Sequence, residues 1–190
     1  MREEFQQEEN WYSRFLPHYN ENGKYQMITY RLNDSLPKEV WDKLGDNSTL
    51  IEANLDQGFG SCLLKNPQYS QIVVDNWLHF HNERYELIAY VVMPNHVHVL
   101  IKVLNDWQLS KIVFSWKKYT AKKILEQERR KGNNLTNLWN REYWDRFIRD
   151  GNHYMNSITY ILNNPVKAGL VKTPKEWKFL GYNKDYLFED

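Results

Sequence analysis

Two histidines near the middle of the chain have the spacing of a metal-ligand pair. They lie in the segment MPNHVHVLI, whose alternating apolar residues predict a β-strand. Because residues i and i+2 of a strand point to the same face, His96 and His98 would stand side by side, with Val97 and Val99 facing the core. Two imidazoles held in this way can bind a divalent metal if a further ligand comes from elsewhere. The alternative is a pair of partly buried histidines satisfied by hydrogen bonds.

A tyrosine and an asparagine near the C-terminal end could supply a nucleophile and a further ligand. The segment YILNNPVKAGL begins at Tyr160, towards the end of a helix predicted over residues 151–163. Tyr160 and Asn164 are four residues apart and would share one helix face. A hydroxyl can act as a nucleophile, and an amide carbonyl is a hard oxygen ligand. The pair Asn164-Pro165 is expected to end the helix, because proline disfavours helical geometry. The alternative makes Tyr160 a core aromatic and Asn164 a helix cap.

The charge of the chain is unevenly distributed. The formal net charge is +1, but residues 102–149 carry 12 Lys or Arg against 5 Asp or Glu. A basic segment beside an acidic remainder favours a polyanionic partner, although a solvated lysine-rich helix is the alternative. Aromatic rings interleaved with the arginines of this segment suit the stacking of unpaired bases. The candidate residues for binding such a partner are Lys111, Lys117, Lys118, Lys122, Lys123, Arg141, Arg146 and Arg149.

The elements that would position these residues alternate between strands and helices. With short connections, this order predicts one antiparallel β-sheet covered by α-helices, an α+β fold. Asp34 to Pro37 reads as a helix start, and the glycine-containing stretch 54–64 as a connector. The expected strands are 25–32, 85–92 and 96–103, the expected helices are 67–83, 109–130 and 151–163, and 138–148 is expected to hold short strands or an extended arm. The predicted organisation is an N-terminal arm (1–24), a single domain (25–180) and a C-terminal tail (181–190).

The composition limits the class of protein. The single cysteine, Cys62, excludes an intramolecular disulfide framework and a cysteine-cluster zinc site. The acidic start is unlike a signal peptide, and the apolar runs are too short to cross a bilayer. We therefore expect a soluble, cytoplasmic protein without a membrane partner. The absence of a phosphate-cradling glycine loop also predicts no nucleotide cofactor.

Taken together and in order, these motifs resemble those of the REP-associated tyrosine transposases. This bacterial family is related to the single-tyrosine HUH transposases of insertion-sequence elements, whose His-U-His motif has a bulky apolar residue at U, here Val97. The resemblance runs from about Leu16 to about Trp177. It is carried by LPHY, YQMITYRLNDSLP, GFGSCLL, MPNHVHVLI, SWKKYTAKK, LWNREYWDRFIRD and YILNNPVKAGLV.

The resemblance implies a ferredoxin-like α/β sandwich and a set of roles. His96, His98 and Asn164 would bind a divalent metal, Mg²⁺ or Mn²⁺, and Tyr160 would be the nucleophile. The implied activity is a metal-dependent cutting and rejoining of single-stranded DNA at palindromic hairpins through a 5′-phosphotyrosine. The implied partner is single-stranded DNA with REP-like hairpins, bound by a monomer or a homodimer.

Two other functions remain open from the sequence. The chain could be a domesticated transposase that binds structured single-stranded DNA without cutting it. It could also be a metal-dependent hydrolase that uses water, with His153 as a further metal ligand. Tyr143 and Tyr154 are the rival nucleophiles, but neither has a polar ligand candidate four residues later.

Overall fold

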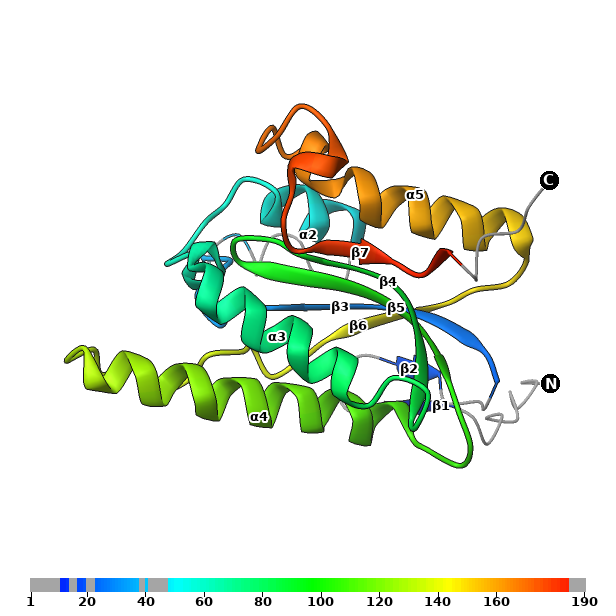
Figure 1. Cartoon of the computed structure of the whole chain (residues 1–190), viewed down its shortest axis with the longest axis horizontal. Coiled ribbons are helices and arrows are strands. Elements are labelled where there is room, and N and C mark those ends of the chain that lie inside the picture. Colours follow the sequence, from blue (N-terminus) through cyan, green and yellow to red (C-terminus); the bar gives the residue numbers. More distant parts are fainter. Residues whose placement is uncertain (1–10, 14–16, 20–22, 38–39, 41–47, 185–190) are drawn as a thin grey trace, which may run out of the picture.

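A five-stranded antiparallel sheet forms the centre of the molecule (Figure 1). The computed structural model describes residues 11–13, 17–19, 23–37, 40 and 48–184. The strand order is β6-β3-β5-β4-β7, and each strand is antiparallel to its neighbours. The strands are β3 (Tyr25–Arg31), β4 (Tyr85–Val92), β5 (His96–Val103), β6 (Trp144–Phe147) and β7 (Leu180–Tyr182).

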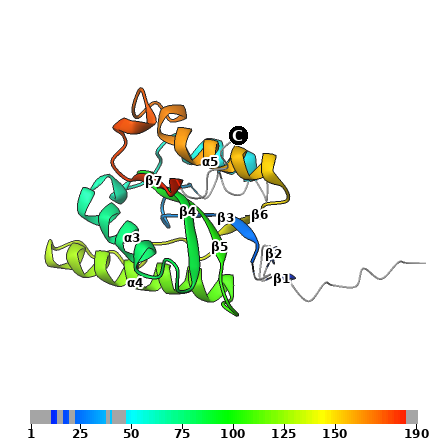
Figure 2. The same cartoon turned by 45° about the vertical axis from the view of Figure 1, so that its right-hand side comes forward.

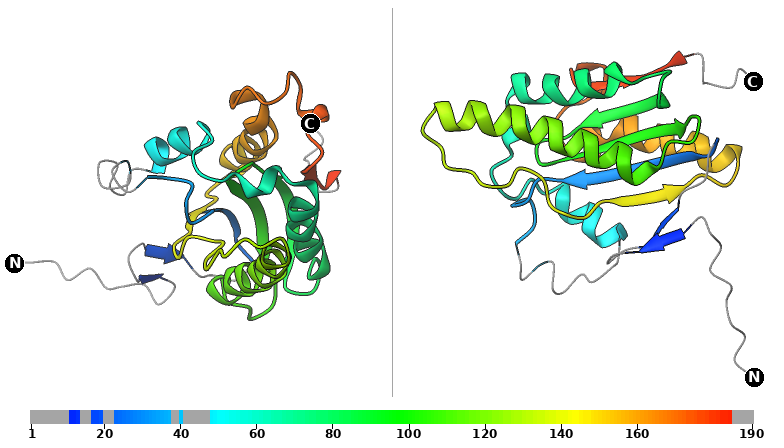
Figure 3. Two further views of the ribbon diagram at one scale, coloured as in Figure 1. Left: turned by 90° about the vertical axis from the view of Figure 1, so that its left-hand side faces the viewer. Right: turned by 90° about the horizontal axis from the view of Figure 1, so that it is seen from below.

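Helices cover both faces of this sheet, so the predicted α+β fold is confirmed. Helices α3 (Pro67–His79) and α4 (Leu109–Arg130) lie on one face. Helices α2 (Ser48–Leu55) and α5 (Gly151–Lys167) lie on the other, as Figure 1 and both views of Figure 3 show. Two 3₁₀ turns, η1 (Leu63–Lys65) and η2 (Pro174–Glu176), connect these layers.

The alternating side chains of β5 build a separate core on each face of the sheet. Val97 and Val99 pack in the cluster that holds Trp116 of α4. Leu100 points the other way and packs in the cluster that holds Ile158 and Ile161 of α5. Because the side-chain period of a strand is two, the two histidines of β5 lie on the α5 face with Leu100.

A short two-stranded ribbon, β1 (Trp11–Ser13) with β2 (Pro17–Tyr19), precedes the sheet. Figure 2 shows this ribbon near β6, and β2 contacts β6. The predicted arm (1–24) and tail (181–190) lie partly outside the described residues, and these boundaries remain predictions.

Most elements agree with those expected, but several details differ. Helix α3 ends at His79 and not near residue 83, because the chain there turns towards β4. The stretch expected to be a connector from residue 54 begins inside α2, a helix that the sequence did not reveal. Strand β7 was also not foreseen. The helix expected after Pro37 falls mostly outside the described residues. Val40 is the one described residue in that stretch, and it is helical.

Helix α5 runs through Pro165 to Lys167, so the prediction that Asn164-Pro165 ends it is wrong. Proline removes only one backbone donor, and here it does so in the last turn. Beyond it, the Leu170 N–H donates to the Pro165 carbonyl at 2.9 Å. Gly169, at a φ of +69°, allows this Schellman ending.

Candidate active site

The two histidines of β5 are buried in the middle of the sheet. Strand β5 lies between β3 and β4, and the register places His98 opposite Thr29 on β3 and opposite Val91 on β4. His96 is 1 % exposed and His98 is fully buried. Burial lowers the pKa of His96 to about 3, with Lys167 acting in the same direction. Both imidazoles are therefore neutral at physiological pH, the form in which histidine binds a metal.

Each imidazole is oriented by a hydrogen bond at its Nδ1 atom. Asn95 donates through its Nδ2 to the backbone carbonyls of Leu55 and Phe59, at 3.2 and 3.1 Å. Its Oδ1 can then only accept, so the His96 Nδ1–H donates to it, at 2.8 Å. The His98 Nδ1 lies 2.7 Å from the Thr29 hydroxyl, which can donate or accept.

The two remaining nitrogens face one another, with the Nε2 atoms of His96 and His98 3.1 Å apart. Since His96 carries its proton on Nδ1, its Nε2 presents a lone pair. If the Thr29 hydroxyl accepts from His98, both Nε2 lone pairs are free to bind one cation. Cis ligands of an octahedral ion with bonds of about 2.1 Å lie about 3.0 Å apart. The pair therefore fits a shared divalent metal.

Tyr160 reaches this pair from α5, the helix that packs over the same face of the sheet. Its ring stands edge-on to the His98 ring, with centroids 5.2 Å apart. Its hydroxyl donates to the Glu52 Oε2 of α2 at 3.1 Å. Burial, reinforced by the negative charges of Glu52 and Asp56, raises the pKa of the Tyr160 hydroxyl above its ordinary value. The nucleophile candidate is thus protonated and needs help to lose its proton.

Asn164, one helical turn after Tyr160, carries a buried amide that makes no hydrogen bond of good geometry within the described part of the chain, although it lies close enough to the Tyr160 hydroxyl to oppose the rise in its pKa. Buried amides are nearly always satisfied, and an exception calls for an explanation. Among the described residues, no three His, Cys, Asp or Glu side chains gather as a metal-binding group. The Asn164 carbonyl is a hard oxygen with the right chemistry for a further protein ligand.

Three charged residues of this site were missed from the sequence: Glu52, Asp56 and Lys167. The Lys167 Nζ lies 3.0 Å from Asp56 Oδ2 and 5.5 Å from the centre of the Tyr160 ring. The Asp56 Oδ1 lies 3.9 Å from His96 Nε2. The available signals were the acidic pair with i, i+4 spacing at 52 and 56 and the lysine inside NNPVKAGL. The first is visible as a pair only once residues 48–55 are known to be helical.

The rival nucleophiles and the alternative histidine ligand lie elsewhere. Tyr143 packs in the core between the sheet and α4, on the face opposite the histidines. Tyr154 is buried against Tyr25, with ring centroids 4.8 Å apart. His153 accepts a hydrogen bond from the Arg149 N–H at the start of α5, about 10 Å along the helix axis from Tyr160. Of the three candidate tyrosines, Tyr160 is the one that the structure brings to the histidine pair.

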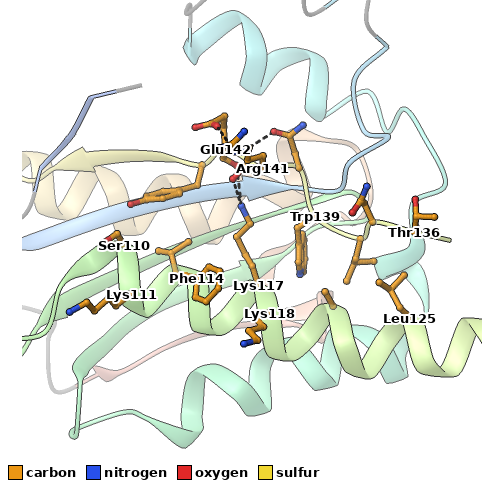
Figure 4. A pocket seen from close by; sticks show the side chains of 16 residues that line it. Ser110, Lys111, Phe114, Lys117, Lys118, Leu125, Thr136, Trp139, Arg141 and Glu142 are labelled. Carbon is orange, nitrogen blue, oxygen red and sulfur yellow. Dashed lines mark hydrogen bonds and ion pairs between the residues drawn. The ribbon is translucent and has the colours of Figure 1, made fainter. Parts of the chain in front are cut away.

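The lysines of α4 are separated from this site by the sheet itself. Lys111, Lys118, Lys122 and Lys123 are exposed. The Lys117 Nζ instead donates to the Arg141 backbone carbonyl at 2.7 Å, and burial lowers its pKa to about 8. Figure 4 shows Lys117 extending from α4 towards the segment that carries Arg141.

This contact crosses a pocket of roughly 920 Å³ between α4 and residues 136–143 (Figure 4). Phe114, which is 65 % exposed, lies on its wall beside Lys111 and Lys118. A ring and two cations at an open pocket suit a nucleic-acid strand, but they lie on the face opposite Tyr160.

Of the arginine candidates, Arg146 is the one whose charge reaches the site. It lies on β6 opposite Met27, whose side chain packs on the α5 face. Burial raises the pKa of Glu52 and lowers that of His98; the Arg146 charge opposes the first shift and adds to the second. Arg141 and Arg149 are exposed at the two ends of the segment that contains β6. The basic candidates thus divide between the two faces of the sheet.

Within the described residues, no helix combines the length and the apolar character needed to cross a lipid bilayer.

Comparison with known proteins shows that this chain is similar to transposases. Residues 74–164, just under half of the chain, match the family described as "Transposase IS200 like". A putative REP-associated tyrosine transposase of Haemophilus influenzae is 28% identical over 111 residues, which cover 55% of this chain and 63% of that protein. A REP-associated tyrosine transposase of Escherichia coli K12 is 28% identical over 105 residues, or 53% and 56% of the two chains. The matched region thus spans less than two thirds of these relatives.

A solved structure shares the fold. The chain of a REP-associated tyrosine transposase bound to a REP hairpin superposes with a TM-score of 0.57 at 24% identity, over 89% of this chain and 82% of that one. Together, the family match, the two relatives and this shared fold confirm the resemblance to the REP-associated tyrosine transposases.

Proposed function

We propose that this chain, a relative of the IS200-like and REP-associated tyrosine transposases, is a metal-dependent single-tyrosine DNA transposase. Its reaction would be the cutting and rejoining of single-stranded DNA at palindromic hairpins. The observation that carries the proposal is the contact between the Tyr160 ring and His98, whose Nε2 faces that of His96. A nucleophile, a pair of neutral nitrogen ligands and an amide oxygen could together support phosphodiester cleavage by a tyrosine.

A divalent metal, Mg²⁺ or Mn²⁺, fits the His96, His98 and Asn164 donor set. When bound, it would neutralise charge on the scissile phosphate. The protein's own contribution is orientation: Asn95 and Thr29 fix the two imidazoles, and burial keeps both of them uncharged.

The Tyr160 oxygen would attack the phosphorus atom as the bond to the 3′ oxygen breaks. The products would be a 5′-phosphotyrosine and a free 3′-hydroxyl. Because the covalent link conserves the phosphodiester energy, attack by a 3′-hydroxyl restores the strand and regenerates Tyr160. Such a reaction needs no nucleotide cofactor.

The proposed partner is single-stranded DNA that contains REP-like hairpins. The solved relative is bound to a REP hairpin, and this supports the proposal. The exposed lysines of α4 and the pocket beside Phe114 offer phosphate and stacking contacts on one face. DNA that also enters the site at Tyr160 would have to pass around an edge of the sheet, and β6, which carries Arg146, lies at one edge.

The test is to incubate the protein with single-stranded DNA carrying a palindromic hairpin, in Mg²⁺ or Mn²⁺. We expect a protein–DNA adduct that survives denaturation, together with a product that ends in a 3′-hydroxyl. Binding without an adduct would instead indicate a domesticated, non-catalytic protein. Cleavage without an adduct would indicate a hydrolase that uses water.

A further inference from the structure

Helix α2 brings a carboxylate into contact with the oxygen that would react. Ile51 and Leu55 of α2 are buried in a small cluster with Leu36, and Trp144 of β6 packs against it. This packing holds α2 over the α5 face of the sheet. Glu52 then accepts the hydrogen bond from the Tyr160 hydroxyl, at 3.1 Å.

We propose that Glu52 is the catalytic base that takes the proton of Tyr160 during strand cleavage and returns it during rejoining. The proposal rests on the proposed function of Tyr160. In the forward step, the tyrosine oxygen bonds to phosphorus, its proton passes to Glu52, and the 3′ oxygen leaves and takes a proton from water. In the reverse step, the 3′-hydroxyl loses its proton to water, its oxygen attacks phosphorus, and Glu52 protonates the departing tyrosine oxygen.

The chemistry of the site favours this role. A tyrosine hydroxyl has a pKa near 10 when unperturbed, so little free phenolate is available at physiological pH. The proton must leave as the new bond forms. Burial raises the pKa of Glu52, which makes the carboxylate a better proton acceptor.

The charged groups that act on Glu52 come from β6, from α5 and from the residue just beyond α2. Arg146 of β6 and Lys167 of α5 lower its pKa, and Asp56, just beyond α2, raises it. Glu52 does not belong to a metal-binding group of His, Cys, Asp or Glu side chains among the described residues. Its direct hydrogen bond to the Tyr160 hydroxyl suits the role of a base.

The decisive variant is Glu52→Gln, which keeps an oxygen that can accept from Tyr160 but cannot take its proton. We expect single-turnover cleavage and rejoining to slow by about 10²- to 10⁴-fold, with hairpin and Mn²⁺ affinity unchanged. The wild-type rate should rise with pH and then level off once Glu52 is ionised. The variant rate should keep rising with hydroxide concentration. Glu83→Gln, at the opposite end of the strands and 63% exposed, is the matched control and should behave as wild type.

A second variant covers the possibility that Glu52→Gln does not fold. In Glu52→Ala, added formate should restore cleavage in proportion to its concentration. Cleavage by Glu52→Gln within about threefold of wild type, a joint loss of cleavage and Mn²⁺ binding, or no rescue of Glu52→Ala would each overturn the base assignment. If the wild type itself forms no adduct through Tyr160, the proposed function fails first.

Discussion

Tyr160 of α5 stands edge-on to His98 of β5, with ring centroids 5.2 Å apart and ring planes inclined at 79°. These residues are far apart in the sequence and come from a helix and from the central strand that it covers. The contact joins the candidate nucleophile to a candidate metal ligand.

Replacing either histidine should abolish metal binding and cleavage together. His96→Ala or His98→Ala removes one of two facing Nε2 donors, and the remaining imidazole cannot hold the ion alone. We expect Mn²⁺ affinity, measured by calorimetry, to fall at least tenfold, with no adduct formed and with EDTA blocking the wild type. EDTA-insensitive cleavage by either variant would restore the interpretation of these residues as core histidines.

Asn164 should be important for the reaction but not for stability. Its buried amide makes no hydrogen bond of good geometry within the described part of the chain. Asn164→Leu, which has a similar volume, therefore leaves no buried partner without a hydrogen bond. We expect an equal or higher melting temperature and a loss of cleavage by at least tenfold. Asn164→Asp, which keeps an oxygen ligand, is the matched control and should retain metal binding. Destabilisation by Asn164→Leu without loss of activity would show a purely structural role.

The metal-free protein should lose stability in acid because of its buried histidines. His96 has a pKa of about 3 in the folded state, against about 6.5 when unfolded, so the unfolded chain binds more protons between these values. The contribution of the neutral His96 to stability is therefore fully present above about pH 6.5 and is lost as the pH drops towards 3. His96 alone contributes up to about 1.4 kcal/mol per pH unit, and His98 acts in the same direction. The free energy of unfolding, measured with urea at several pH values in this range, should change less steeply with pH in His96→Gln than in the wild type. An equal dependence on pH would contradict the burial argument.

The exposed lysines of α4 should affect DNA binding but not the chemical step. Lys118→Ala with Lys122→Ala removes two cations from the face opposite Tyr160. We expect weaker binding to all single strands, and a log–log salt dependence flatter by about 0.7 units for each lost phosphate contact. Single-turnover cleavage at saturating protein should stay near wild type. An unchanged salt slope would show that these lysines are merely solvated.

The main elements of the fold could be predicted because their patterns are local. The alternation in β5 and the apolar stripe of α4 follow directly from the strand and helix periods, and both elements have the predicted bounds. The end of α5 could not be predicted by the same logic. The last turn of α5 tolerates Pro165 because the backbone carbonyls around it accept hydrogen bonds from the residues that follow.

The candidate site could be predicted only in part. His96, His98, Tyr160 and Asn164 lie in recognisable motifs, whereas Glu52 reaches Tyr160 through the packing of α2 on the sheet, which is a long-range effect. The sequence also gave no sign that the lysines of α4 and the histidines lie on opposite faces. That arrangement depends on which side of the sheet each helix crosses.

The central claim is that Tyr160 becomes covalently linked to DNA. The most direct measurement is peptide mapping by mass spectrometry of the adduct formed on single-stranded hairpin DNA, comparing wild type with Tyr160→Phe and, as a control, Tyr154→Phe. Phenylalanine keeps the ring that packs against His98 and removes only the attacking oxygen, so hairpin binding and the melting temperature should hardly change. We expect a phosphotyrosyl peptide at Tyr160 in the wild type and in Tyr154→Phe, and no adduct in Tyr160→Phe. An adduct in Tyr160→Phe, or one mapped to another tyrosine, would contradict the account.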